Sequence, residues 1–194
     1  MQMTTRERFR RMYEHRDADR IPIHDSAWKS TLERWQREGL PASSSWVDYF
    51  DLDHVGSYRP DNSPRYPAET VEETDEYIIF TTSWGATLKD FKHQTSVPDH
   101  IDYTIKDADA WRAARKRITP RRDRIDWDAL DARYKQVRAA DGWFRAGLWF
   151  GFDVSHARMV GTERLLMALA TEPDWIVDMW THQLEVNLAL LDMM

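Results

Sequence analysis

The sequence predicts an α/β fold in which short parallel strands alternate with helices. Residues 20–24 and 143–150 look like strands of a central parallel sheet, and helical periodicity follows each of them. Residues 76–83 and 86–91 predict two further strands joined at Trp84 and Gly85, a β-hairpin inserted beside the main sheet. An eight-stranded parallel barrel needs about 250 residues. The 194 residues of this chain therefore predict an incomplete barrel.

The helices of the first part have recognisable start and stop signals. Thr4 followed by Glu7 is a capping-box pattern, which predicts that the chain starts with a short amphipathic helix. A second helix is predicted from the apolar spacing that begins at Trp28, and Gly39 ends it. Residues 55–58 are expected to be extended, and the proline-rich residues 59–67 are expected to form a loop.

Four helices are predicted in the second part from their capping residues. Asp107 and Asp126 are N-cap residues of two helices, because a carboxylate accepts hydrogen bonds from the first free amides of a helix. Thr162 opens the next helix. Pro173 fits the first turn of the last one, where a missing amide hydrogen costs nothing.

The last helix carries an apolar stripe that continues to the end of the sequence without a stop signal. The stripe repeats at three- and four-residue spacing and consists of Ile176, Val177, Trp180, Leu184, Leu188 and Leu191. An apolar helix face needs a covering surface. We therefore expect the chain to be the first part of a larger fold, or to associate with itself or with a C-terminal-half partner.

Composition excludes several classes of protein. A net charge of -6 and a pI near 5.6 oppose broad contact with nucleic acid or an anionic membrane, because such contact needs a basic face. The sequence has no cysteine, which excludes disulfides and thiolate nucleophiles within the chain. No apolar run approaches the length of a membrane span. These features predict a soluble cytoplasmic protein.

His24 and Asp25 are the first candidate site residues. They follow the first predicted core strand, and the carboxyl ends of barrel strands form the active-site face. His24 is a candidate for substrate binding and Asp25 for a catalytic base. The alternative for Asp25 is a cap on the helix that starts near Trp28.

The second group of candidates follows the second predicted core strand. Phe150 and Phe152 are candidates to line an aromatic or flat ligand, although core packing is the alternative for both. His156 is a candidate acid or base, with Asp153 and Arg158 as substrate-binding residues. The same three residues would equally form a hydrogen-bonded surface turn.

Asp51, Asp53 and His54 also cluster, but such a group is more often found solvating a turn than holding a metal ion. No metal ligand is predicted.

Seven stretches form an ordered pattern along nearly the whole chain. They are residues 5–9, 19–23, 31–41, 73–77, 84–85, 96–98 and 150–163. In order and spacing the chain resembles the uroporphyrinogen decarboxylase superfamily, in particular its decarboxylase-like and corrinoid-linked methyltransferase branch. The family fold is a (β/α)8 TIM barrel. The resemblance therefore implies that residues 1–194 are the N-terminal portion of such a domain, truncated in its last helix.

The chain departs from the true decarboxylases after the first predicted strand. Those enzymes carry arginines there that hold the substrate carboxylates, whereas here Lys29 is the only cation of residues 24–30. The resemblance thus implies an enzyme of corrinoid-linked methyl transfer to a small molecule, working with a corrinoid protein and zinc. No cysteine and no histidine pair at ligand spacing is present, so no zinc ligand is assigned in this chain.

Two alternative functions remain open. One is a porphyrinogen carboxy-lyase of tetrapyrrole (porphyrin) biosynthesis in which other residues bind the substrate carboxylates. The other is a non-catalytic assembly or binding subunit that docks through its sheet edge and its last helix.

Overall fold

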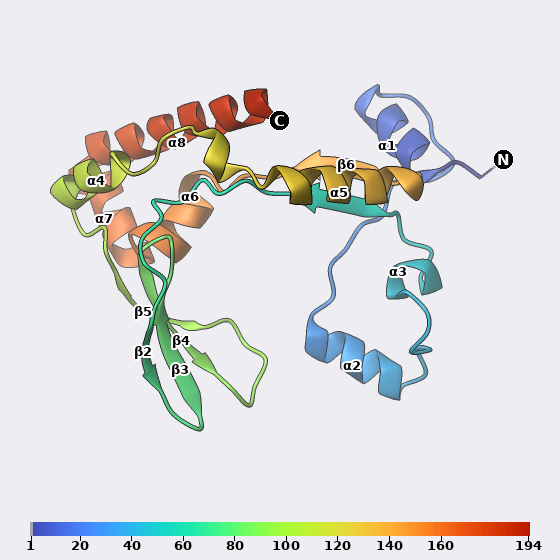
Figure 1. Cartoon of the computed structure of the whole chain (residues 1–194), viewed down its shortest axis with the longest axis horizontal. Coiled ribbons are helices and arrows are strands. Elements are labelled where there is room, and N and C mark those ends of the chain that lie inside the picture. The colour runs from blue at the N-terminus through green and yellow to red at the C-terminus, as the bar shows by residue number, and fades with distance from the viewer. Residues whose placement is uncertain (1) are drawn as a thin grey trace. The chain divides into compact units, whose positions relative to one another are not determined.

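The computed structural model describes residues 2–194, which divide into two units (Figure 1). Unit 1 comprises residues 2–59 and 126–147, and unit 2 comprises residues 60–125 and 148–194. The chain therefore leaves unit 1 after its first strand and returns to it later.

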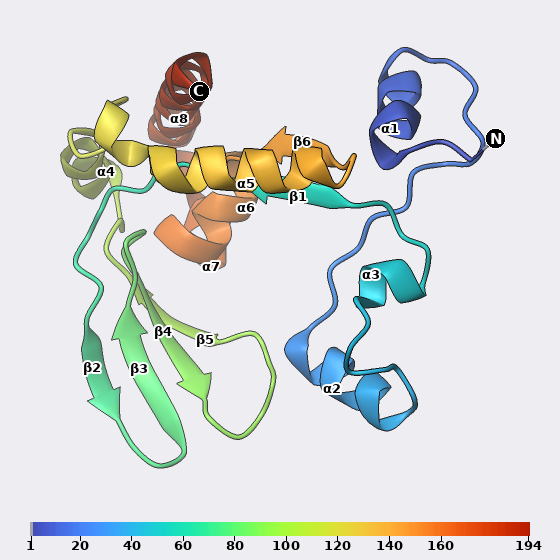
Figure 2. The ribbon, with the colours of Figure 1, turned by 45° about the vertical axis from the view of Figure 1, so that its right-hand side comes forward.

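Unit 1 is built around two parallel strands. Its elements are α1 (Thr5–Tyr13), α2 (Lys29–Arg37), α3 (Trp46–Tyr49), β1 (Val55–Tyr58), α5 (Trp127–Ala139) and β6 (Trp143–Ala146). Strands β1 and β6 pair in parallel, with Val55 opposite Trp143 and Ser57 opposite Arg145. Helix α5 precedes β6 in sequence and runs alongside both strands (Figures 1 and 2). This β-α-β arrangement is the repeating unit of parallel α/β folds.

Helices cover both faces of the small sheet in part. On one face the Tyr134 ring of α5 meets the Phe144 ring edge-on, with centroids 5.4 Å apart. On the other face Phe9 of α1 stacks on Trp143 at 5.5 Å. Among the described residues of unit 1, only Leu40 and Val137 belong to the buried apolar core. Unit 1 therefore has little hydrophobic core of its own.

The strand predicted at residues 20–24 is not formed. Residues 21–24 have no regular secondary structure, because Pro22 has no amide hydrogen to donate and the Ile23 amide donates to the Asp53 carboxylate at 2.7 Å. The Ile23 carbonyl accepts one backbone bond, from the Asp53 amide at 2.8 Å. The predicted strand thus makes one backbone hydrogen bond next to the start of β1, and no ladder forms. Strand β1, which was predicted only to be extended, is the partner of β6 instead.

The second predicted core strand is shorter than expected and is not buried on both faces. Strand β6 ends at Ala146, and Arg145 and Ala146 are exposed. The Gly147 amide still donates to the Tyr58 carbonyl at 3.0 Å, after which the chain enters unit 2. With two strands in the sheet, solvent reaches positions that a wider sheet would cover.

Unit 2 contains a four-stranded antiparallel sheet. The strands are β2 (Thr70–Glu73), β3 (Tyr77–Thr81), β4 (Ala86–Phe91) and β5 (Asp99–Tyr103), in the order β2-β3-β4-β5 (Figure 2). The predicted hairpin is confirmed as β3 and β4. Its turn depends on Gly85, which has φ +91° and whose added Cβ would lie 2.9 Å from the Tyr66 ring.

Helices form the rest of unit 2. They are α4 (Ala108–Arg115), the short 3₁₀ helix η1 (Arg122–Arg124), α6 (Gly151–Val154), the π-helical turn η2 (Ser155–Met159), α7 (Thr162–Thr171) and α8 (Pro173–Met193). Trp111 of α4 is fully buried and donates its Nε1 hydrogen to Asp178 of α8 at 2.7 Å. Ile118, Leu165, Ile176 and Met179 are also fully buried, so the core of unit 2 lies among α4, α7 and α8.

The predicted apolar stripe of α8 is largely wrong as a buried face. Ile176 is buried, but Val177, Leu184, Leu188 and Leu191 are 55, 44, 52 and 40% exposed. The buried side consists instead of Ile176, Met179, Gln183, Val186, Asn187 and Leu190. Apolar residues occupy both sides of this helix, so its periodicity alone could not select the packed side.

Both sheets are small and open, and the described residues form an α/β fold in which no barrel is closed. No helix within residues 2–194 is long and apolar enough to cross a membrane.

Candidate active site

The sequence-predicted site residues fall into both units. His24 and Asp25 belong to unit 1, whereas Phe150, Phe152, Asp153, His156 and Arg158 belong to unit 2.

His24 lines a cavity of about 220 Å³ in unit 1, together with Arg133 and Gln136 of α5. Partial burial lowers the pKa of His24 below its ordinary value, the positive charge of Arg145 lowers it further, and Asp25 acts in the opposite direction. His24 is therefore mainly neutral at pH 7. A neutral imidazole beside two guanidinium groups can accept a proton or a hydrogen bond from a ligand.

Asp25 does not cap α2. Its Oδ1 accepts from the neighbouring Ser26 amide at 2.7 Å, and the N-cap position belongs to Trp28, which makes no side-chain cap. Asp25 is exposed, so it stays available to a ligand.

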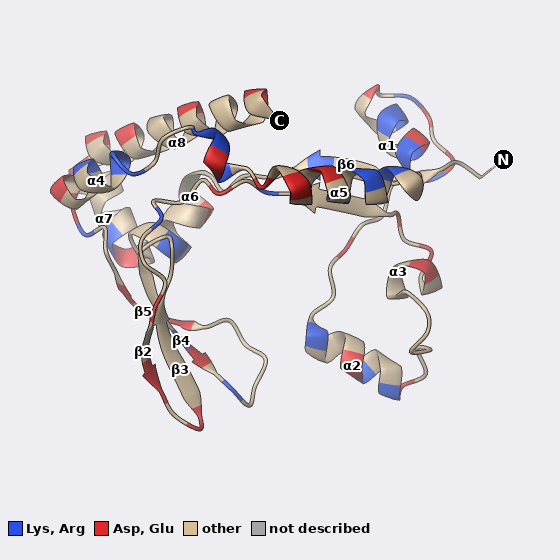
Figure 3. Ribbon diagram, in the orientation of Figure 1, with Lys and Arg blue, Asp and Glu red and all other residues tan. Residues whose placement is uncertain are grey.

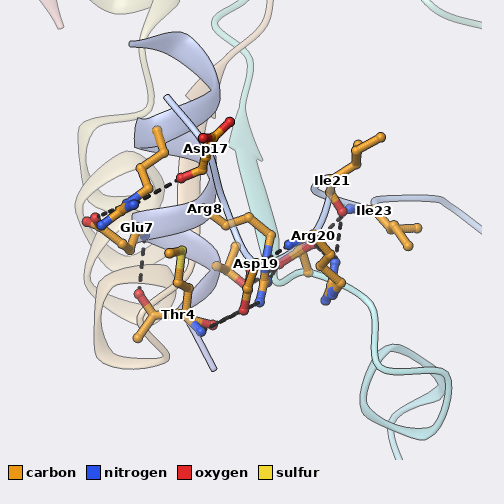
Figure 4. A network of polar contacts seen from close by, with 12 residues as sticks. Thr4, Glu7, Arg8, Asp17, Asp19, Arg20, Ile21 and Ile23 are labelled. Atoms are coloured by element: carbon orange, nitrogen blue, oxygen red, sulfur yellow. Dashed lines mark hydrogen bonds and ion pairs between the residues drawn. The ribbon is translucent and has the colours of Figure 1, made fainter. Parts of the chain in front are cut away.

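Asp53 is the centre of a buried ionic network that was not predicted from the sequence. Its carboxylate, with no exposed area, accepts hydrogen bonds from Arg20 at 2.6 Å, from Thr5 at 3.0 Å, from the Ile23 amide and from Arg8. Figure 4 shows Arg8 and Arg20 converging with Asp19, which accepts from Arg8 Nε at 2.7 Å. The expectation that Asp53 solvates a turn is thus wrong.

Burial acts to raise the pKa of Asp53, but the hydrogen bonds from the Ile23 amide, Arg20, Thr5 and Arg8 outweigh it and leave the pKa below its ordinary value. The carboxylate is saturated by its own chain, so its role is to join the 19–23 segment and α1 to the start of β1. No group of three His, Asp or Glu that could hold a metal ion occurs among the residues described.

In unit 2 the candidates lie on one continuous turn of chain. Phe150 is the extended residue before α6, Gly151 begins α6 with φ +71°, and the π-helical turn η2 follows. The turn is fixed from both sides, because Ser155 Oγ donates to the Gly151 carbonyl at 2.7 Å and accepts from Trp180 Nε1 at 2.9 Å. π-Helical turns are rare in proteins, and many of those that occur lie at functional sites.

The His156 imidazole has a defined partner on each side. Its Nδ1 lies 3.2 Å from the Thr162 hydroxyl, and its Nε2 lies 3.8 Å from Asp153 Oδ1. The Phe152 ring stacks on the imidazole at 5.2 Å, with an angle of 27° between the planes. Among the described residues the Thr162 hydroxyl is the one hydrogen-bond partner of the ring, and the Asp153 carboxylate lies beyond hydrogen-bond distance. A histidine oriented by a hydroxyl and a stacked ring can act as an acid or base.

Thr162 connects His156 to a cavity of about 610 Å³. The walls are formed by β5, with His100 and Tyr103, and by the first turn of α7 after Gly161. Gly161 has φ +92°, and a Cβ there would lie 2.6 Å from the Tyr103 ring, so only glycine allows the ring to lie against this turn. Burial raises the pKa of the Tyr103 hydroxyl, while Arg164 lowers it. The volume is within the range of small-molecule sites.

The remaining candidates are placed around this turn. The Arg158 guanidinium lies 4.4 Å from the centre of the Trp149 ring. Phe150 and Phe152 are 44 and 45% exposed, so neither is a core residue. The packing alternative for these two rings is therefore wrong, and Phe152 presents aromatic surface beside His156.

A buried polar cluster behind the turn was also missed. Asn62 Nδ2 donates to the Trp149 carbonyl at 2.7 Å and to Asn187 Oδ1 at 2.8 Å, and Asn187 Nδ2 donates to the same carbonyl at 3.1 Å. Gln183 Nε2 meets Met159 Sδ at 2.8 Å, but the buried Gln183 Oε1 has no partner among the described atoms. The sequence did contain a signal for this cluster, because Gln183 and Asn187 are polar and lie four residues apart within the mostly apolar last helix.

Gln183→Met is expected to leave the free energy of unfolding unchanged or to raise it by about 1 kcal/mol, because it removes a buried oxygen that has no donor. Asn187→Leu is the matched control. It removes an acceptor from Asn62 and should cost about 1–3 kcal/mol. Urea unfolding of both variants measures the difference, and equal losses for the two would contradict the assignment.

No protein-family model, no curated protein sequence and no solved structure matches this chain.

Proposed function

We propose that this chain is a substrate-binding part of a small-molecule enzyme of the uroporphyrinogen decarboxylase superfamily, in the branch of corrinoid-linked methyl transfer. The observation that carries the enzymatic part is the His156 imidazole, whose Nδ1 contacts the Thr162 hydroxyl, because Thr162 itself lines a cavity of about 610 Å³. The family resemblance of the sequence supplies the type of reaction.

The β1-α5-β6 unit supports this proposal at the level of architecture. Strands β1 and β6 are adjacent and parallel, and α5 precedes the second of them. A (β/α)8 barrel consists of eight parallel strands that are connected in this way, each followed by a helix. The second sheet interrupts this unit between β1 and α5, as the predicted hairpin insertion would.

Zinc, which activates the thiol in the related methyltransferases, does not fit the described residues. The sequence has no cysteine, and residues 2–194 contain no group of three His, Asp or Glu that could hold a metal ion. No step is therefore assigned to zinc here. A corrinoid is larger than the cavity, so the proposal places it on a partner protein and reserves the cavity for the small methyl acceptor.

In this proposal His156 takes the proton that the acceptor loses. Asp153 stabilises the resulting imidazolium by its negative charge, Phe152 keeps the ring in its plane, and the Thr162 hydroxyl orients Nδ1. The exposed Phe150 ring and Arg158 lie outside the lining of the cavity, so no contact with the acceptor is proposed for them.

Demethylation of methylcobalamin in the presence of a small thiol, followed by absorbance, tests the proposal on the whole chain. His156→Gln should lower the rate by about 10²–10⁴-fold, the usual contribution of a positioned acid or base. His93→Gln, which alters another exposed histidine of unit 2, is the control and should leave the rate unchanged.

Analysis of the products formed from uroporphyrinogen is the second arm. Decarboxylated products without methyl transfer would replace the proposal by a carboxy-lyase. Absence of both reactions, or equal rates for His156→Gln and His93→Gln, would overturn it.

A further inference from the structure

Helix α8 has two apolar sides, and one of them is uncovered. The inner side packs in the core of unit 2 through residues such as Ile176 and Leu190. The other side, which we call the outer stripe, consists of Val177, Leu184, Leu188 and Leu191, each at least 40% exposed. A contiguous row of large exposed apolar side chains marks a protein interaction surface.

One flank of the outer stripe is lined by acidic residues. Asp174, Glu185 and Asp192 are eleven and seven residues apart, which places them along one line of a helix with 3.6 residues per turn. All three are exposed, and none has an ion-pair partner among the described residues. Helix α8 itself contains no Lys or Arg, and Figure 3 shows its ribbon with acidic segments only. The flank therefore carries uncompensated negative charge.

This charge disfavours a second copy of the chain as the occupant. Two copies of α8 that packed antiparallel through their outer stripes, around a two-fold axis perpendicular to both helices, would place both acidic lines on the same side of the pair. Like charges would then face each other along the seam. A partner with positive charge beside its apolar residues would instead gain from the same acids.

We propose that the outer stripe of α8 binds an amphipathic helix of another protein, whose apolar side is flanked by Lys or Arg. From Val177 to Leu191 the stripe extends for about 21 Å, at 1.5 Å per residue, so the partner helix needs about four turns. This inference stands on α8 alone and does not depend on the proposed function.

Two designed peptides of about 18 residues test the proposal against the whole chain. They share one row of leucines and differ only in flanking residues, which are Lys in one and Glu in the other. Fluorescence anisotropy of the labelled Lys peptide should show saturable binding with one peptide per chain. The Glu peptide should bind at least about tenfold more weakly, because its charges oppose the acidic flank.

Variants locate the binding surface. Leu184→Ser and Leu188→Ser should each weaken binding of the Lys peptide by at least about tenfold, because central apolar contacts dominate such interfaces. Leu166→Ser is the matched control, since Leu166 is 52% exposed on α7. The combined change Asp174→Asn, Glu185→Gln and Asp192→Asn should reduce the salt dependence of binding. Circular dichroism of each variant confirms that the helices are retained.

Three results would overturn the proposal. The first is equal binding of the two peptides, and the second is undiminished binding by Leu184→Ser with an intact fold. The third is pairing of α8 with itself. Leu184→Cys detects it, because the chain has no cysteine and an oxidised dimer of this variant can form only between introduced residues.

Discussion

Asp53→Ala is expected to destabilise unit 1 by about 3–5 kcal/mol, the usual cost of removing one partner from a buried ion pair. Arg8 is only 3% exposed and would lose one of its two carboxylates, while Arg20 and the Ile23 amide would lose their acceptor. Unit 1 buries few apolar side chains, so little else compensates. Urea unfolding at pH 7 measures the loss. Asp17→Ala, a change of an exposed carboxylate on the same segment, should stay within about 0.5 kcal/mol of the parent chain.

The same network predicts how stability depends on pH. The pKa of Asp53 is held below its ordinary value, so the ionised carboxylate stabilises the folded state above that value and loses this effect as the pH falls through the lowered pKa. Asp19 has its pKa lowered in the same direction, chiefly by Arg8. The free energy of unfolding should therefore decrease below about pH 4. Asp53→Asn should make this decrease smaller, and an unchanged acid dependence would contradict the role assigned to Asp53.

Gly56→Ala is expected to cost about 1–3 kcal/mol by overpacking the contact between β1 and α5. An added Cβ would lie 2.0 Å from Val137 Cγ2, and Val137 is one of the few buried apolar residues of unit 1. Strand and helix would have to separate, because both contacting groups are close to the backbone. Chemical unfolding of the variant measures the loss.

A second substitution separates this collision from other effects. Val137→Ala removes the colliding methyl groups, so the double variant should lose less than the sum of the two single variants, by about 0.5–3 kcal/mol. Gly39→Ala is the control for backbone strain, because Gly39 has φ +119° and no atom within 4 Å of an added Cβ. Strict additivity of Gly56→Ala and Val137→Ala would show that their contact is not the cause.

Features set by neighbouring residues were predicted correctly from the sequence. The caps at Thr4, Asp107 and Asp126 form as expected, with side chains that accept from the amides of Glu7, Ala110 and Ala129 at 3.2, 2.8 and 2.9 Å. The hairpin of β3 and β4 was also found, because alternation and a glycine turn are local signals.

Features that depend on distant residues were not predicted. Residues 20–24 have the better strand pattern, but β6 pairs with β1, whose sequence contains Gly56 and Ser57 and looks weaker. The local sequence around Asp53 is typical of a turn, and only the tertiary structure shows that Arg8 and Arg20 bind its carboxylate. For α8, both sides are apolar, and the choice between them is made by α4 and α7. Tertiary packing overrides local preference in each case.

The candidate site shows the same division. His156, Asp153 and Phe152 were found because they lie within one turn of chain. The cavity lined by Thr162 was not predicted, because β5 and α7 are distant in sequence and their approach depends on Gly161.

The route of the chain through the two units has a consequence for the order of folding. Val55 pairs with Trp143, and the whole antiparallel sheet lies between them in sequence. Contacts between residues so distant form slowly, because the loop between them loses entropy before any pairing is gained. The hairpin of β3 and β4 has no such delay. During synthesis β1 therefore remains an unpaired strand until β6 has been made, and over that interval its edge is exposed to chaperones and to aggregation.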